Sequence, residues 1–470
     1  MQNSRSLALY HYWVAFGTFL PAVLLGAWQM LMRSPLPAPL DDPDAYYASV
    51  TLHGTAMAYV VTTFFAMGFG YAIAAKSLGR PIRGAAAAWI GFVICLIGTV
   101  MAVVTVLAGK ASVLYTFYPP LLASPWYYLG AFLLIGGSMI WVVLMVVNMT
   151  AWKRDNPGRP VPLAMFAITA TALLWAWAAS GVEIASSAGP TPSTAQASSS
   201  SNHSSPSWWR CRLCSPCFRF PPLWKLPGRH RGGRGLLGWI GALPWNEPMV
   251  LAVGLSLVML GLGGFGGLIN MSYAMNSMIH NSSWVTAHFH LIFGGAAVIM
   301  YFAIAYEMWP RITGKPLRSK RLACWQLWLW FWGMLITTIP WHIAGLMGQP
   351  RRIAIFDYNI PLVARTAALV ITSVIGGLVL LIAATLLIII LVRSHLGERA
   401  LTQPLRYALA VNPPQQVPAA LNGFALWNAV LLAVMVVTYG YPIGQFFFLK
   451  SHSVPAVQVT SQESASMGAR

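Results

Sequence analysis

The chain has 470 residues, of which 57% are hydrophobic and only 8% are charged. A soluble globular protein carries about 25% charged residues, so this composition, together with a mean hydropathy of +0.63, excludes a soluble protein and indicates a polytopic membrane protein. The formal net charge of +19 does not indicate a nucleic-acid partner, because the cytoplasmic loops of membrane proteins carry an excess of lysine and arginine.

Ten apolar runs are long enough to cross a bilayer about 30 Å thick, which takes about 20 helical residues. Transmembrane strands would instead show alternating segments of about 10 residues. We therefore predict an all-α polytopic membrane protein, with helices in 1–184 and 234–446, an aberrant segment at 185–233 and a polar tail at 447–470. The predicted helices lie near 10–32, 51–75, 85–108, 126–149, 162–184, 248–270, 286–307, 324–346, 366–393 and 422–446.

The loop charges predict how these helices are oriented. Basic residues follow the second, fourth and seventh predicted helices, so these three loops are predicted to be cytoplasmic. Asp41, Asp42 and Asp44 lie between the first two helices and place that loop on the outer side. The N-terminus is then predicted to be cytoplasmic, and the first apolar run shows no cleavage site of a signal peptide.

This orientation requires an odd number of membrane crossings between residues 185 and 245. The fifth helix must end outside near Glu183, whereas the helix at 248–270 must begin inside. No apolar run in between is long enough to span a bilayer. The orientation therefore predicts that part of the bundle is missing from this stretch.

Three interpretations compete for residues 185–233. A disordered linker fits the Ser/Pro-rich composition but does not restore the topology. A metal site at Cys211, Cys214 and Cys217 resembles part of an iron–sulfur pattern, although a fourth ligand is absent. Translation in the wrong frame after a deletion is the interpretation that we favour, because WWRCRLCSPC can be encoded so that another frame reads Val-Ala-Val-Pro-Ser-Leu-Leu-Thr.

Three histidines carry the candidate chemistry. His53 lies in TLHGTAMAYVV, and His288 and His290 lie in WVTAHFHL. Ionisable groups at membrane depth indicate a functional site, and the orientation places all three at one depth near the outer ends of their helices. Residues i and i+2 of a helix point about 200° apart, so His288 and His290 are predicted to serve two cofactors. His53 with His290 suits a bis-histidine heme and His288 suits a heme with an open position; histidines bonded to backbone carbonyls are the alternative.

Two adjacent arginines follow the helix at 324–346, in the sequence GLMGQPRR. Arg351 and Arg352 face outside against the positive-inside tendency, which favours a fixed anionic partner such as heme propionates. Asn276 and His280, which precede the helix of His288, are candidate hydrogen-bond partners of the same groups. Ordinary loop residues are the alternative for this second pair.

The motifs WVTAHFHL, TLHGTAMAYV, LYTFYPPL, GLMGQPRR and RITGKPL resemble those of heme–copper terminal oxidase subunit I, B-type branch, over residues 8–184 and 234–446. The resemblance implies a bundle of 12–13 helices, of which about 10 are recognisable, in a bacterial or archaeal cytoplasmic membrane. It implies a low-spin b-like heme on His53 and His290, a high-spin a-, o- or b-type heme on His288, and propionates held by Arg351 and Arg352. Tyr118 is a candidate near the dioxygen site, with a packed loop tyrosine as the alternative.

The resemblance implies an activity, but this sequence departs from the family pattern at the copper site. Family members reduce dioxygen to water with electrons from cytochrome c or quinol, coupled to proton translocation, beside subunit II and small subunits. Their copper is held by a His-Pro-x-x-x-Tyr segment and a His-His pair, and neither motif occurs in this sequence. The missing segment falls between Ile184 and Arg234, where the topology also fails, so we predict that the chain as written cannot reduce dioxygen by four electrons.

Alternatives to the oxidase come from different classes. A catalytically dead heme-binding membrane protein would retain only the heme of His53 and His290. A nitric oxide reductase shares the heme histidines but also needs histidines from the missing segment. A transporter is the weakest alternative, because only Glu183 lies near a span interior and no inverted repeats or paired broken helices are visible.

Overall fold

The computed structural model describes residues 2–40, 42–117, 121–187, 228–235, 237–400 and 422–448. Residues 1–157 and 161–408 form one compact unit. The second unit comprises 158–160 and 409–470, and its described helix is α18 (Ala425–Phe448). The predicted all-α architecture is confirmed in the part of the chain that the structure describes.

Eight described helical segments are long and apolar enough to cross a membrane. Two predicted spans begin earlier than their apolar runs indicate: the second extends over Pro43–Ser77 instead of starting at 51, and the seventh over Ser283–Thr313 instead of 286–307. Capping explains the early starts. Asp42 accepts a hydrogen bond from the amide of Ala45 at 2.9 Å at the start of Pro43–Ser77, and Ser282 caps the start of Ser283–Thr313. Helices therefore begin at polar caps rather than at the first apolar residue.

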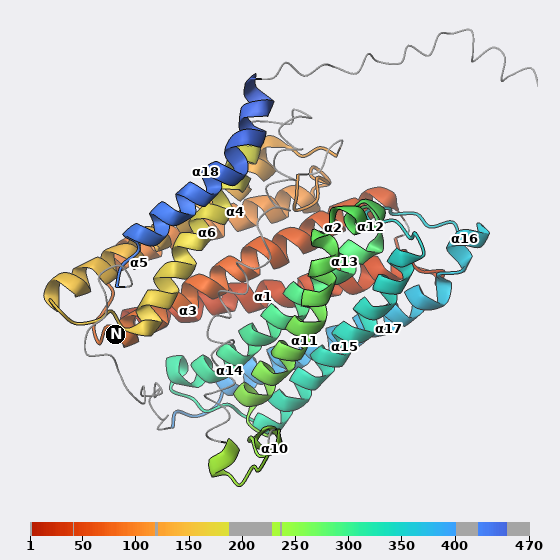
Figure 1. Cartoon of the computed structure of the whole chain (residues 1–470). Coiled ribbons are helices and arrows are strands. Elements are labelled where there is room, and N and C mark those ends of the chain that lie inside the picture. Colours follow the sequence, from red (N-terminus) through yellow and green to blue (C-terminus); the bar gives the residue numbers. More distant parts are fainter. Residues whose placement is uncertain are drawn as a thin grey trace, which may run out of the picture. The chain divides into compact units, whose positions relative to one another are not determined.

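The first half of the large unit runs from α1 to α6 (Figure 1). Helix α1 packs against the segment formed by α2, η1 and α3, while α4 packs against α5 and α5 against α6. The elements are α1 (Gln2–Met32), α2 (Pro43–Gly54), η1 (Thr55–Val61), α3 (Thr62–Ser77), α4 (Ala85–Leu107), α5 (Pro125–Asp155) and α6 (Leu163–Ser187).

The second half of the large unit follows as α10 to α17 (Figure 1). Helix α15 packs against α17, and α11 packs against η2 and α14. The elements are α10 (Gly238–Gly241), α11 (Pro248–Met271), α12 (Tyr273–Ile279), α13 (Ser283–Phe289), η2 (His290–Ala297), α14 (Val298–Thr313), α15 (Lys320–Leu346), α16 (Pro361–Ala364) and α17 (Ala367–His395).

The two halves meet along α1. Phe19 of α1 is buried and lies edge-on to Phe302 of α14, at 5.5 Å between ring centres, and beside Trp330 of α15 at 5.3 Å. Large aromatic rings bury the most apolar area per residue, so this contact joins the halves into one core.

The large unit has two ends where its polar loops lie. We call the end that carries α12 (Tyr273–Ile279) the α12 end and the other one the opposite end. At the opposite end Asp155 pairs with Arg80 and Arg83, and Glu247, just before α11, pairs with Lys320 at 2.9 Å. Helix α6 runs back beside α5 from this end, and its Trp175 donates a hydrogen bond to Ser138 of α5 at 2.7 Å. Helix α6 thus approaches the α12 end, whereas α11 begins at the opposite end.

Two π-helical segments interrupt the bundle at corresponding places. One, η1, begins at Thr55, directly after His53 and Gly54, and the other, η2, begins at His290. π-Helical turns inside α-helices occur frequently at functional sites. These segments were not predictable from the sequence, because an inserted residue in a helix leaves no periodic signal in so short a stretch.

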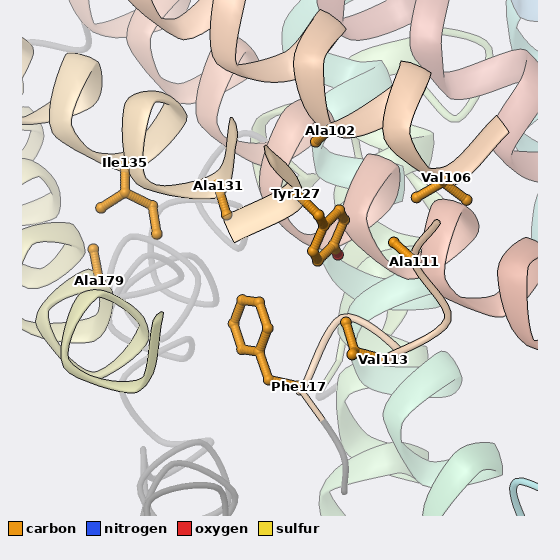
Figure 2. Packing of buried hydrophobic residues seen from close by; sticks show 9 residues of the cluster. All are labelled: Ala102, Val106, Ala111, Val113, Phe117, Tyr127, Ala131, Ile135 and Ala179. Atoms are coloured by element: carbon orange, nitrogen blue, oxygen red, sulfur yellow. The ribbon is translucent and has the colours of Figure 1, made fainter. Parts of the chain in front are cut away.

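The connection from α4 to α5 folds onto the same part of the bundle. An apolar cluster holds it, made by Ala102, Val106, Ala111, Val113, Phe117, Tyr127, Ala131, Ile135 and Ala179 (Figure 2). The amide of Leu114 also donates to Thr51 Oγ1 at 2.9 Å, two residues before His53 on α2. The loop is thereby fixed against α2.

Candidate functional site

His53 is half-buried on α2 and is oriented by helix α1. Its Nδ1 lies 2.6 Å from the carbonyl oxygen of Ala22. A carbonyl oxygen only accepts, so Nδ1 carries the proton and Nε2 keeps the lone pair that a metal needs. The ring packs on Gly26, where an added Cβ would lie 2.9 Å from Cε1 of His53.

His290 is also half-buried and is held in the same way by its own helix. Its Nδ1 lies 2.8 Å from the carbonyl oxygen of Thr286, one turn earlier. Trp341 of α15 meets the imidazole edge-on, with 5.3 Å between ring centres. Nε2 is again the nitrogen available to a metal.

The structure brings these two imidazoles together. Their ring centres lie 6.3 Å apart and their planes differ by 13°. A metal midway between two imidazoles, with metal–nitrogen bonds of about 2 Å, leaves roughly 6 Å between the ring centres. The separation, the parallel planes and the two available Nε2 atoms therefore fit a metal held between α2 and η2.

His288 lies away from this pair, against α11. A Cβ on Gly266 would lie 3.1 Å from its Nδ1, and one on Gly267 would lie 3.3 Å from its Cε1. The two histidines of HFH thus lie on different sides of their helix, as the i, i+2 spacing predicts. Within the described residues no group of three or more histidine, cysteine, aspartate or glutamate side chains is placed to hold a metal.

The loop that carries Arg351 and Arg352 is attached to the start of the histidine helix α13. Ser283 donates its amide to Gln349 O at 2.8 Å, and Arg351 donates its amide to Asn281 O at 3.0 Å. Arg351 is buried, and Arg352 has a φ of +63°, a left-handed conformation that costs energy for a residue other than glycine. Such strained residues cluster at ligand clamps.

His280 lies close to these two arginines. Burial first, and then the charges of Arg351 and Arg352, lower the pKa of His280 below its ordinary value of 6.5. Asn276 accepts the backbone hydrogen bond of His280 at 2.8 Å and precedes it by one helical turn. The structure therefore groups all four predicted polar residues at the α12 end.

Tyr118 lies outside the residues that the structure describes, but the preceding part of its loop reaches the histidine helix. Tyr115 stacks on Phe289, the residue between His288 and His290 in the sequence, with 6.1 Å between ring centres. The same ring occupies the space over Gly54, where a Cβ would lie 2.5 Å from Cδ1 of Tyr115. The glycine of the HG dipeptide is thus explained by this contact.

A helical membrane bundle with paired imidazoles from two helices defines a class of membrane protein that can hold a metal centre. The comparisons with known proteins specify the class further. The family model described as cytochrome c and quinol oxidase polypeptide I matches residues 6–201 and 192–379. The chain belongs to this family of cytochrome c oxidase-type oxidoreductases, which are transmembrane proteins of the respiratory chain.

Individual relatives agree with this assignment. Cytochrome c oxidase subunit 1 of Thermus thermophilus is 29% identical, over 86% of this chain and 87% of the relative. The protein of the same name from a Bacillus species is 30% identical over 47% of this chain and 36% of the relative. A chain from a cryo-EM structure of a heme–copper terminal oxidase dimer has the same fold, with a TM-score of 0.83 at 23% identity, covering 94% of this chain and 92% of that one.

Proposed function

We propose that the chain is a terminal oxidase subunit I that keeps a low-spin heme on His53 and His290 but has lost its copper site. The parallel imidazoles, 6.3 Å apart between ring centres, carry this proposal. A heme bound by two histidines supplies one-electron transfer.

The residues of this chain orient the ligands. Carbonyl oxygens of Ala22 and Thr286 hold the Nδ1 protons of His53 and His290, which fixes both tautomers and raises the basicity of Nε2. Because each acceptor belongs to a helix backbone, the rings keep their direction without a bound group. Helix α1 and the histidine helix thus preorganise the site.

His288 is the proposed ligand of the second, high-spin heme, and Arg351, Arg352, His280 and Asn276 are proposed to hold propionates. The grouping of these polar residues at the α12 end supports the second role. Tyr118 stays a candidate near the dioxygen site, since Tyr115 of the same loop stacks on Phe289.

The proposed loss of copper is supported by the sequence, which contains neither a His-Pro nor a His-His dipeptide. The alignment with the Thermus thermophilus relative supports a deletion: it extends over 492 positions, whereas 86% of 470 residues is about 404. About 88 residues of the relative thus have no counterpart, enough for three spans of about 20 residues with their loops. The opposite placement of the end of α6 and the start of α11 supports an odd number of missing crossings.

The family assignment also supports a setting for the proposed protein. We propose electron supply from cytochrome c or quinol, assembly with a subunit II, and a bacterial or archaeal cytoplasmic membrane with the N-terminus inside. The basic loops after α3 and α5, which lie together at the opposite end, support this orientation.

Optical and electron paramagnetic resonance spectra of the purified chain test the heme proposal. We expect the signature of a bis-imidazole low-spin heme, lost in His53→Ala and in His290→Ala. His342→Ala is the matched control, because His342 also binds a carbonyl one turn earlier, that of Thr338 at 2.7 Å, but lies outside the pair. A low-spin signature that survives both ligand substitutions contradicts the proposal.

Resequencing the genomic DNA across the codons for 180–240 tests the deletion. Reads that restore a continuous frame with the His-Pro-x-x-x-Tyr segment and the His-His pair identify an active oxidase subunit. Reads that confirm the sequence as given leave a degraded gene whose product at most binds heme.

A further inference from the structure

Exposed methionines gather at the α12 end. Among the methionines whose side chains the structure describes, only Met271, Met275, Met278 and Met347 are exposed, and all four lie at this end. The first three fall within residues 271–278 and are 78%, 53% and 85% exposed. Methionine is an apolar residue that ordinarily fills gaps in a core. Packing therefore does not explain why three of them lie together at the surface.

These three methionines do not belong to the lipid-facing surface of a membrane span. The candidate spans on either side are Pro248–Met271 and Ser283–Thr313, so α12 lies outside both, and Met271 is the last residue of the first. Serine, asparagine and histidine residues separate and follow the methionines, a composition typical of loops that face water. Contact with lipid therefore does not account for their exposure either.

Helix α12 places the three methionines within reach of one another. Met275 and Met278 are three residues apart in this helix, so their Cβ atoms lie about 5–6 Å from each other. Met271 directly precedes the N-cap Ser272, and a residue in that position commonly lies over the first turn of the helix, which here includes Met275. Sulfur atoms that share one metal ion, at about 2.3 Å each, lie about 4 Å apart, and flexible methionine side chains can reach this separation.

The donor atoms and the surrounding charges select the kind of ion. Thioether sulfur is a soft, neutral ligand that suits Cu(I), whereas carboxylate and carbonyl oxygens suit Mg²⁺ and Ca²⁺. No aspartate or glutamate occurs between Glu247 and Glu307 in the sequence. Arg351 and Arg352 at the same end oppose a divalent cation more strongly than a monovalent one, because the Coulomb energy scales with the charge of the ion. The site therefore suits a soft monovalent cation.

We propose that Met271, Met275 and Met278 form a three-thioether site for Cu(I) at the α12 end. The site is separate from the paired imidazoles and does not replace the copper ligands that the sequence lacks, so it does not depend on the proposed heme. Exposed neutral ligands exchange their ion readily. The site therefore fills where Cu(I) is supplied and empties in a chelating buffer, and it leaves no copper on the chain after purification in such a buffer.

Titration of the full chain in nanodiscs with Cu(I), in anaerobic reducing buffer and in competition with bicinchoninate, tests the site. We expect a single Cu(I) ion per chain, bound roughly tenfold or more weakly in Met275→Leu and in Met278→Leu, because each loses one of three ligands. Leucine keeps the volume of methionine, so the thermal unfolding temperature should not change. Met347→Leu is the matched control, since it removes an exposed methionine of another element at the same end and should leave the affinity unchanged.

X-ray absorption at the copper edge separates thioether ligation from binding elsewhere on the chain. We expect a first shell of sulfur alone, which is lost when Met271, Met275 and Met278 are all replaced by leucine. A first shell of nitrogen would assign the ion to histidines such as His280 and overturn the inference. Equal affinity of the triple variant and the original chain, or an equal loss of affinity in Met347→Leu, would also overturn it.

Discussion

At the scale of single residues, the site depends on a glycine as well as on its histidines. The His53 ring occupies the space over Gly26, and a methyl group there would meet Cε1 at 2.9 Å. Because the hydrogen bond to Ala22 already fixes Nδ1 of this ring, the imidazole cannot turn away without losing that bond. Gly26 is therefore as necessary to the orientation of His53 as its hydrogen-bond acceptor.

We expect Gly26→Ala to displace the His53 ring and reduce low-spin heme content several-fold, without unfolding the chain. Gly17→Ala is the matched control on the same helix, since an added Cβ there has nothing within 4 Å; it should leave heme content unchanged. Heme-to-protein ratios from pyridine hemochromogen assays measure both. Equal heme content in the two variants contradicts this account.

The charges around His280 predict a pH effect. We expect Arg352→Gln to raise the pKa of His280, which burial, Arg351 and Arg352 hold below 6.5, while Arg318→Gln, in the loop before α15, leaves it unchanged. Histidine-selective NMR in nanodiscs measures the titration. Unfolded chains protonate histidine near pH 6.5 and the folded chain only at lower pH, so His280 makes the fold lose stability as pH falls below about 6.5. A lower pKa in Arg352→Gln contradicts the assigned cause.

Some residues of the candidate site could be predicted from the sequence and others could not. His53, His288 and His290 stand out because imidazoles are costly in apolar runs, and Arg351 and Arg352 stand out against the positive-inside tendency. Gly26 and Tyr115 were missed, because their importance depends on contacts with His53 and Phe289, which lie on other elements. Such contacts cannot be derived from one sequence.

At the scale of elements, glycines seven residues apart determine how α4 and α5 pack. A Cβ on Gly98 of α4 would lie 2.5 Å from Gly130 O, and one on Gly137 of α5 would lie 2.7 Å from Cys95 Sγ. The two backbones are therefore in contact, as small residues allow in membrane helices. The other face of α4 carries exposed Val93, Ile97 and Val100, which suit lipid.

We expect Gly98→Ala to separate these helices at a cost of about 1–3 kcal/mol and to lower the thermal unfolding temperature in detergent. The control Gly136→Ala lies on α5 with nothing within 4 Å of an added Cβ, so its unfolding temperature should stay close to that of the original chain. Two equal unfolding temperatures contradict the close packing.

The elements themselves were largely predictable from apolar length, since each of the eight described spans overlaps a predicted one. Their starts were not, because Asp42 and Ser282 extend two helices beyond the apolar residues. The π-helical turns at Thr55 and His290 were also missed. Such turns arise from packing between helices, which period and composition do not encode.

At the scale of the whole molecule, two successive described helices lie at different ends of the large unit where the chain leaves one and enters the next. Helix α6 approaches the α12 end and α11 starts at the opposite end, beside Lys320. The odd number of crossings that the loop charges predict between them agrees with these helix directions. The proposed heme ligands His53 and His290, and the carbonyls that hold them, lie on α1, α2, α13 and η2. The proposed site therefore lies outside the stretch between Ile184 and Arg234 that is proposed to be altered.

This separation predicts different fates for heme and copper. We expect the chain as written to bind low-spin heme but only background copper, and to consume no dioxygen. A chain in which the corresponding Thermus thermophilus segment replaces residues 185–233 should gain stoichiometric copper, measured by plasma mass spectrometry against heme. In that restored chain His288→Ala should abolish carbon monoxide binding and keep the low-spin heme, because His288 lies against α11 and outside the pair. Dioxygen reduction by the chain as written would mean that copper is not required, or that its ligands come from another polypeptide.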